Sequence, residues 1–262
     1  MFKRKHSHFS GMHNILLTEK SVSNILPAMI ELKSVTKKFG SLVAVDNVSF
    51  SVGTGEYFAL LGPNGAGKTT VVRMLLDFTR PTSGSLSVDG LPAERARCRA
   101  AVGYLPENHR IPTNLSGWQY LQRCAKLIGL KHDEAEDQCM RIVELIGMQG
   151  REHSKSGTYS KGMMQRFGLG VALIGRPKLL ILDEPASGLD PIGIRETRQL
   201  LESLKNQGMT LILNSHLLSE VEKICDSAAI INHGKLMVRD KISSLVKDGD
   251  SLEDVFVRLV KG

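Results

Sequence analysis

The sequence has little or nothing of several features that define whole classes of protein. Aromatic residues make up 5% of the 262 residues, which disfavours a sheet that stacks RNA bases on aromatic rings. None of the four cysteines forms a C-x-x-C pair, and no histidine cluster completes a zinc site. The longest stretch without Asp, Glu, Lys or Arg runs from Asn206 to Ser219 and contains polar residues, whereas a transmembrane helix needs about 20 mostly apolar residues. We therefore expect reduced, mostly buried thiols and no membrane span in this chain.

What is present is a globular composition. Hydrophobic residues make up 42% and charged residues 23%, which excludes disorder, collagen-like repeats and coiled coil as the main class. A single core rarely grows beyond about 250–300 residues, so the length predicts one large domain or one domain with an insertion. The net charge of +7 is compatible with nucleic acid, anionic lipid or nucleotide, and does not choose between them.

Apolar patterning divides the chain into segments. Residues 1–29 show no period and no signal-peptide apolar region, so we expect a disordered N-terminal extension followed by a domain over 30–262. Short alternating or apolar runs predict strands at 30–35, 45–52, 56–61, 84–88, 101–105, 179–182, 210–213 and 228–231. Helices are expected at 69–78 and 192–206, and a helical subdomain at about 108–160. The alternation of strands and helices predicts an α/β domain with a parallel sheet.

Residues 62–69 read Gly-Pro-Asn-Gly-Ala-Gly-Lys-Thr and fit the pattern G-x-x-x-x-G-K-[ST]. Glycines let successive backbone N–H groups curl around phosphate oxygens, and the helix that follows presents its positive end to an anion. Lys68 can reach the β- and γ-phosphates, and the hydroxyl of Thr69 can bind Mg²⁺. The alternative is a glycine-rich turn without a ligand, which the buried strand before it and the helix after it disfavour.

Two acids follow the apolar run 179–182. Strand ends of this kind line the ligand crevice of an open α/β sheet. Asp183 is placed to bind Mg²⁺ directly or through water, and Glu184 to polarise a water for attack on the γ-phosphate. An ordinary strand-to-turn sequence is the alternative, and the phosphate loop upstream disfavours it. Before this strand, Ser160 is expected to cap a helix whose first N–H groups face outward, with or without a ligand.

From this order of motifs, the chain resembles the ATP-binding cassette ATPases, the nucleotide-binding domains of ABC transporters, over about residues 30–262. Residues 62–69 match the Walker A loop, and 179–183 match Walker B followed by the catalytic glutamate. Ser160 and Gly162 match the LSGGQ signature, residues 187–190 the D-loop, and His216 the switch histidine. Phe39 matches the aromatic residue that stacks on adenine.

The chain departs from the family pattern in the signature and in the Q-loop. Lys161 and Met163 replace a Gly and a Gln of the signature, and Glu107 stands where many members have Gln. A glutamate can still coordinate Mg²⁺, but it adds a charge near the γ-phosphate. Both departures, and the tail 251–256, are similar to the branch that serves ABC-2-type exporters.

The resemblance implies a P-loop NTPase parallel-sheet core with an antiparallel β subdomain and an inserted helical subdomain. The implied cofactors are ATP and Mg²⁺. The implied catalytic residues are Glu184, His216 and Lys68, and the implied Mg²⁺ ligands are Thr69, Asp183 and Glu107. The implied ATP contacts are Phe39, Gly62, Pro63, Asn64, Gly65, Ala66, Gly67, Lys68, Thr69, Thr70, Glu107, Ser160 and Gly162.

The family mechanism implies partners. Two ATPase subunits, here a homodimer, pair head to tail, so that the signature of one completes the phosphate loop of the other. Closure acts on a separate transmembrane permease docked near Glu107 and the helical subdomain, at the cytoplasmic face of the membrane, and no nucleic acid is expected.

Two other function classes are weighed against a transporter subunit. The first is a soluble, non-transport cassette protein acting on ribosomes or DNA. Such proteins usually join two cassettes in one chain or carry long coiled coils, and this chain has one phosphate loop and no heptad array. The second is a regulatory scaffold without turnover, which intact Lys68, Asp183, Glu184 and His216 disfavour.

Overall fold

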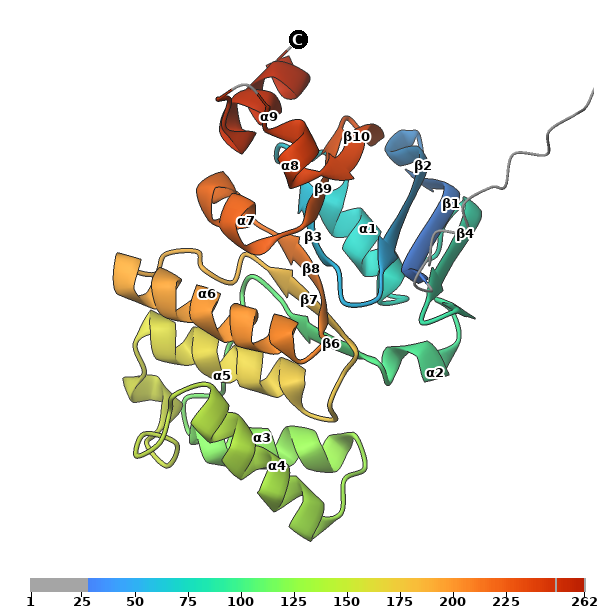
Figure 1. Ribbon diagram of the computed structural model, residues 1–262. Coiled ribbons are helices and arrows are strands. Elements are labelled where there is room, and N and C mark those ends of the chain that lie inside the picture. The colour runs from blue at the N-terminus through green and yellow to red at the C-terminus, as the bar shows by residue number, and fades with distance from the viewer. Residues whose placement is uncertain (1–27, 248, 262) are drawn as a thin grey trace, which may run out of the picture.

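A six-stranded sheet forms the centre of the molecule (Figure 1). The computed structural model describes residues 28–247 and 249–261. The strand order is β10-β9-β3-β8-β7-β6. The strands are β3 (Tyr57–Leu61), β6 (Val102–Leu105), β7 (Leu179–Asp183), β8 (Thr210–Asn214), β9 (Ser227–Asn232) and β10 (Lys235–Lys241). All neighbours are parallel except β10, which pairs antiparallel with β9. Because β3, β7 and β8 are buried along their whole length, they are continuous apolar runs with polar residues only at their ends.

A second, antiparallel sheet packs beside the first and confirms the predicted β subdomain (Figure 1). Its strand order is β2-β1-β4-β5, with β1 (Ala28–Phe39), β2 (Leu42–Gly53), β4 (Ser83–Val88) and β5 (Leu91–Pro92). Ala28 pairs with Gly53, and Met29 is buried, so β1 begins two residues before the predicted domain boundary at Ile30. That boundary is therefore wrong, because the first two residues of the strand already contribute to the sheet. The rest of the predicted extension, residues 1–27, lies outside the described residues.

Helices cover both faces of the central sheet and form the insertion. They are α1 (Lys68–Leu75), α2 (Ala96–Arg99), α3 (Gly117–Leu127), α4 (His132–Leu145), the 3₁₀ turn η1 (Ser156–Thr158), α5 (Lys161–Leu173), α6 (Pro191–Asn206), α7 (Leu218–Ile224), α8 (Ile242–Leu245) and α9 (Leu252–Lys261). In Figure 1, α3 and α4 form a layer at the opposite end of the molecule from α9. Helix α5 packs against α3, α4 and β6, so it connects this helical subdomain to the sheet.

The order of the predicted strands and helices along the chain is confirmed, while β5, α7, α8, β10 and α9 are among the elements that were not predicted. Strand β10 is an exposed edge strand, and α9 is a short amphipathic helix after a turn. The described cysteines are all free and three are buried, as expected. Within residues 28–247 and 249–261, no helix combines the length and the apolar character that crossing a membrane requires.

Candidate ATP site

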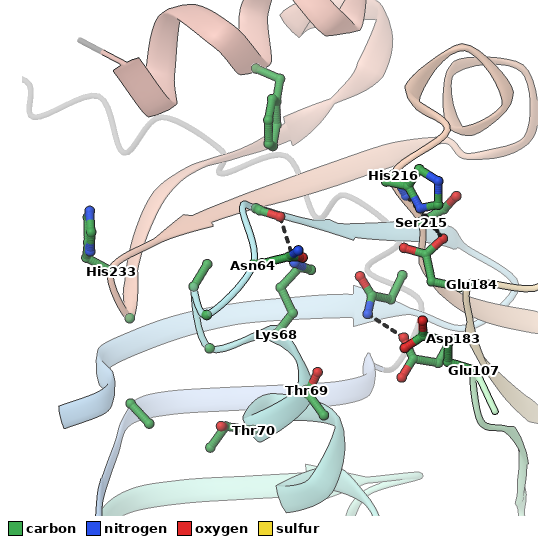
Figure 2. A pocket seen from close by; sticks show the side chains of 18 of the residues that line it. Asn64, Lys68, Thr69, Thr70, Glu107, Asp183, Glu184, Ser215, His216 and His233 are labelled. Atoms are coloured by element: carbon green, nitrogen blue, oxygen red, sulfur yellow. Dashed lines mark hydrogen bonds and ion pairs between the residues drawn. The ribbon is translucent and has the colours of Figure 1, made fainter. Parts of the chain in front are cut away.

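A cavity of about 890 Å³ opens where β3, β7 and β8 end (Figure 2). Most of the predicted site residues line it, although they come from five separate segments of the chain. These residues are Phe39, Gly62, Asn64, Gly65, Ala66, Gly67, Lys68, Thr69, Thr70, Glu107, Asp183, Glu184 and His216. The cavity is therefore large enough, and chemically suited, for a nucleotide with its phosphates on the 62–69 loop.

The loop between β3 and α1 has a conformation that its glycines make possible. Gly62 and Gly67 have φ angles of 153° and 109°, which residues other than glycine rarely adopt. A Cβ atom at Gly67 would overlap the carbonyl oxygen of Ala44, and one at Gly62 would overlap that of Ile231. The loop is thus held tightly against β2 and β9 and leads directly into α1, as a phosphate cradle requires.

Lys68 is the first residue of α1 and extends along the inside of the loop. Its Nζ donates hydrogen bonds to the carbonyl oxygens of Gly62, at 2.6 Å, and of Pro63, at 3.0 Å. Burial lowers the pKa of Lys68, while the nearby charges of Glu184 and Asp183 oppose that shift. Pro63 was predicted to contact ATP, but it does not line the cavity and acts here through its carbonyl group on Lys68.

Asp183 ends β7 and is 7% exposed. Asn214, at the end of the neighbouring β8, donates a hydrogen bond of 2.5 Å from Nδ2 to Oδ1 of Asp183. Burial raises the pKa of Asp183, the Asn214 bond lowers it, and the charge of Glu107 raises it. Asn214 Oδ1 is buried without a partner among the described residues, so it is available to accept a hydrogen bond from a water or ligand. Asn214 was not among the predicted site residues, although a polar residue ending an apolar strand was a usable signal.

Glu184 and His216 lie next to each other, on the side of the cavity that also carries Asp183 and Glu107 (Figure 2). His216 Nδ1 is 2.7 Å from Glu184 Oε2. The Glu184 backbone has a φ of 55°, and its N–H donates to the carbonyl oxygen of Asn214 at 2.8 Å. A non-glycine residue rarely adopts a φ in this range, and such strain concentrates at functional sites.

The oxygen-bearing side chains fit a hard cation. Thr69, Asp183 and Glu107 supply the hydroxyl and carboxylate oxygens that Mg²⁺ prefers. Among residues 28–247 and 249–261, no three His, Cys, Asp or Glu side chains are grouped closely enough to hold an ion alone.

The signature residues do not reach this cavity within one chain. Ser160 caps α5 as predicted, with its Oγ accepting from the backbone N–H of Met163 at 3.2 Å. Ser160 and Gly162 line a different hollow, together with residues 188–190 and the start of α6. The ATP cavity has additional lining residues that were not predicted, namely Leu42, Val43, Ala44, Asn214, Ser215, Leu218, His233, Gly234 and Phe256.

Asn214→Ala is expected to destabilise the protein by about 1–3 kcal/mol, because it leaves the buried Asp183 carboxylate without its hydrogen bond. Urea unfolding measures the change, and Asn206→Ala, at an exposed position of α6, is the matched control. The hydrogen bond from Asn214 lowers the pKa of Asp183. The difference in free energy of unfolding between variant and parent is therefore present at pH values where Asp183 is ionised, and it shrinks as pH falls through the pKa of Asp183. Equal stability of variant and parent at neutral pH would show that this bond contributes nothing.

Comparison with known proteins gives one consistent result. The model of the family described as "ABC transporter" matches residues 45–187. An uncharacterized ABC transporter ATP-binding protein, YhcH of Bacillus subtilis, is 43% identical over 81% of this chain and 70% of its own length. The lantibiotic transport ATP-binding protein SrtF of Streptococcus pyogenes is 34% identical over 87% of this chain and 96% of its own length. Two further relatives are longer, and the chain spans 62% and 59% of them. A solved ATP-binding subunit of an ABC transporter superposes with a TM-score of 0.80 at 28% identity, covering 88% of this chain and 99% of that one.

Proposed function

Because the chain belongs to the ABC transporter family, we propose that it binds and hydrolyses Mg²⁺-ATP and thereby powers transport through a separate membrane subunit. One observation carries this proposal: a single cavity combines the phosphate loop with Lys68, the buried acid Asp183 and the Glu184–His216 pair. A site for nucleotide binding alone would not need an acid and a histidine 2.7 Å apart.

Each residue has a role that follows from its position. Lys68 exchanges its two carbonyl partners for phosphate oxygens. Asp183 and Thr69 hold Mg²⁺, which neutralises charge on the phosphates. Glu184 accepts the proton of the attacking water, and His216 holds that carboxylate in place. Phe39 ends β1, is 47% exposed and lines the cavity with the Lys37 ammonium 4.8 Å from its ring centroid, and adenine stacks on this ring.

A second copy of the chain completes the site in this proposal. Ser160 and the N-terminal end of α5 form an anion-binding surface that lies outside the chain's own ATP cavity. In a head-to-tail homodimer, this surface contacts the γ-phosphate bound by the other subunit. ATP then stabilises the closed dimer, and hydrolysis removes that stabilisation.

The proposed direction of transport is export, because the signature, the Q-loop and the tail 251–256 are similar to the branch that serves ABC-2-type exporters. SrtF, which the chain matches over 96% of its length, is named for lantibiotic transport. The permease docks near Glu107 and the α3–α4 subdomain, at the cytoplasmic face of the membrane. A non-transport cassette acting on ribosomes or DNA has no observation in its favour here.

Affinity purification tests the coupling to transport. The tagged full chain, recovered from detergent-solubilised membranes of its own host, is expected to bring with it a polytopic membrane protein. The complex is expected to hydrolyse ATP, and a Lys68→Ala complex is expected to be inactive. Recovery with ribosomes or DNA instead would contradict the proposed transport function but not the proposed hydrolysis of ATP.

A further inference from the structure

The ATP cavity has an excess of negative charge. Three carboxylates line it, those of Glu107, Asp183 and Glu184, whereas Lys68 is the one Lys or Arg among its described lining residues. The charge of Glu107 acts on Asp183, so these two carboxylates are close enough to repel each other. A triphosphate adds more negative charge than one Mg²⁺ removes. The occupied cavity would therefore hold a surplus of negative charge that its own chain does not neutralise.

The hollow beside Ser160 has the opposite imbalance. Its cations are Arg151, Lys161 and Arg166, and its acids are Asp190 and Glu196. Arg166 pairs with Glu196, and Asp190 Oδ1 accepts the cap hydrogen bond of α6 from the N–H of Gly193. Within the described part of the chain, the ammonium of Lys161 has neither a hydrogen bond nor an ion pair.

Lys161 is exposed and lies where the start of α5 meets the turn before α6. It is the first residue of α5, directly after the Ser160 cap, and its side chain runs across Gly188. A Cβ atom at residue 188 would overlap the Lys161 Nζ, so the ammonium occupies space that only a glycine leaves. An unpaired cation thus lines the same hollow as the hydroxyl that the proposed dimer directs at a γ-phosphate.

We propose that Lys161 of one subunit is the compensating cation for the nucleotide bound by the other. Its ammonium contacts the γ-phosphate held by the second subunit's phosphate loop and offsets the charge of the partner subunit's Glu107. Hydrogen bonds between an ammonium and a phosphate are among the stronger polar contacts, and they would favour the ATP-bound dimer specifically. This inference rests on the proposed head-to-tail dimer, since Lys161 and Glu107 line separate hollows that share no residue within one chain.

The first test measures the Mg²⁺-ATP concentration at which half of the protein is dimeric, by analytical ultracentrifugation in a Glu184→Gln parent. Lys161→Met keeps the aliphatic stem and removes the charge, so we expect this concentration to rise about tenfold. Lys161→Arg is expected to stay within about threefold of the parent, because it keeps a phosphate-binding cation. Lys126→Met, at an exposed position of α3 outside both hollows, is the control and is expected to match the parent. Binding of Mg²⁺-ADP to the monomer, measured by calorimetry, is expected to be the same in all four proteins.

The second test is a double-mutant cycle. Adding Glu107→Gln to Lys161→Met is expected to bring the half-dimerisation concentration back to within about threefold of the parent, because the uncompensated charge is gone. Independent, additive effects of the two changes would overturn the proposal, as would a Lys161→Met protein that dimerises like its parent. If the parent itself does not dimerise with ATP, the composite site fails, which separates failure of the proposed function from failure of the Lys161 role alone.

Discussion

Glu184→Gln is expected to lower ATP turnover by about 10²–10⁴-fold while Mg²⁺-ATP stays bound. The carboxamide keeps the size of the side chain and can still face His216, which lies 2.7 Å from the carboxylate in the wild-type protein. It can no longer take a proton from water at neutral pH. Phosphate release measures turnover, and gel filtration with Mg²⁺-ATP is expected to show a dimer that persists because the nucleotide is not consumed.

The control for this variant is Glu202→Gln, which makes the same chemical change on the outer surface of α6. It is expected to retain the wild-type rate. Residual hydrolysis in Glu184→Gln close to that of the wild type would mean that a group other than Glu184 is the base.

A mixture of two inactive variants is expected to recover one functional nucleotide site per dimer. Lys68→Ala damages the phosphate loop, and Ser160→Arg blocks the signature surface of α5. A homodimer of either variant would have two defective sites. In the heterodimer both lesions fall in one site, and the other combines the intact loop of the Ser160→Arg chain with the intact signature of the Lys68→Ala chain.

The measurement is the number of ATP molecules per isolated heterodimer, with Glu184→Gln present in both chains to prevent turnover. For a site shared between subunits, we expect about one ATP per heterodimer and no ATP stably bound by a homodimer of either variant. If mixing restores no ATP-dependent dimer, Ser160 does not act on the other subunit's nucleotide.

Several features of the site are determined locally and were readable from the sequence. The phosphate loop is eight consecutive residues followed by a helix, so its motif is recognisable without any distant contact. The Ser160 cap bonds to an N–H three residues away, and Asp183 ends an uninterrupted apolar strand. Short-range periodicity also predicted the succession of most strands along the chain. It did not identify β10, whose residues are mostly exposed and bury no continuous apolar face.

The tertiary structure alone decided how these local features combine. The pairing of Asn214 with Asp183 and the approach of His216 to Glu184 span 31 and 32 residues, and they exist because β7 and β8 end side by side in a parallel sheet. Crossover connections bring such ends together, and no local pattern specifies which polar residues then face each other. The same holds for Lys161 against Gly188, where a helix start meets the turn before α6. The sequence therefore determined which chemical groups the protein has, while the sheet order decided which of them share the ATP cavity and which face outward.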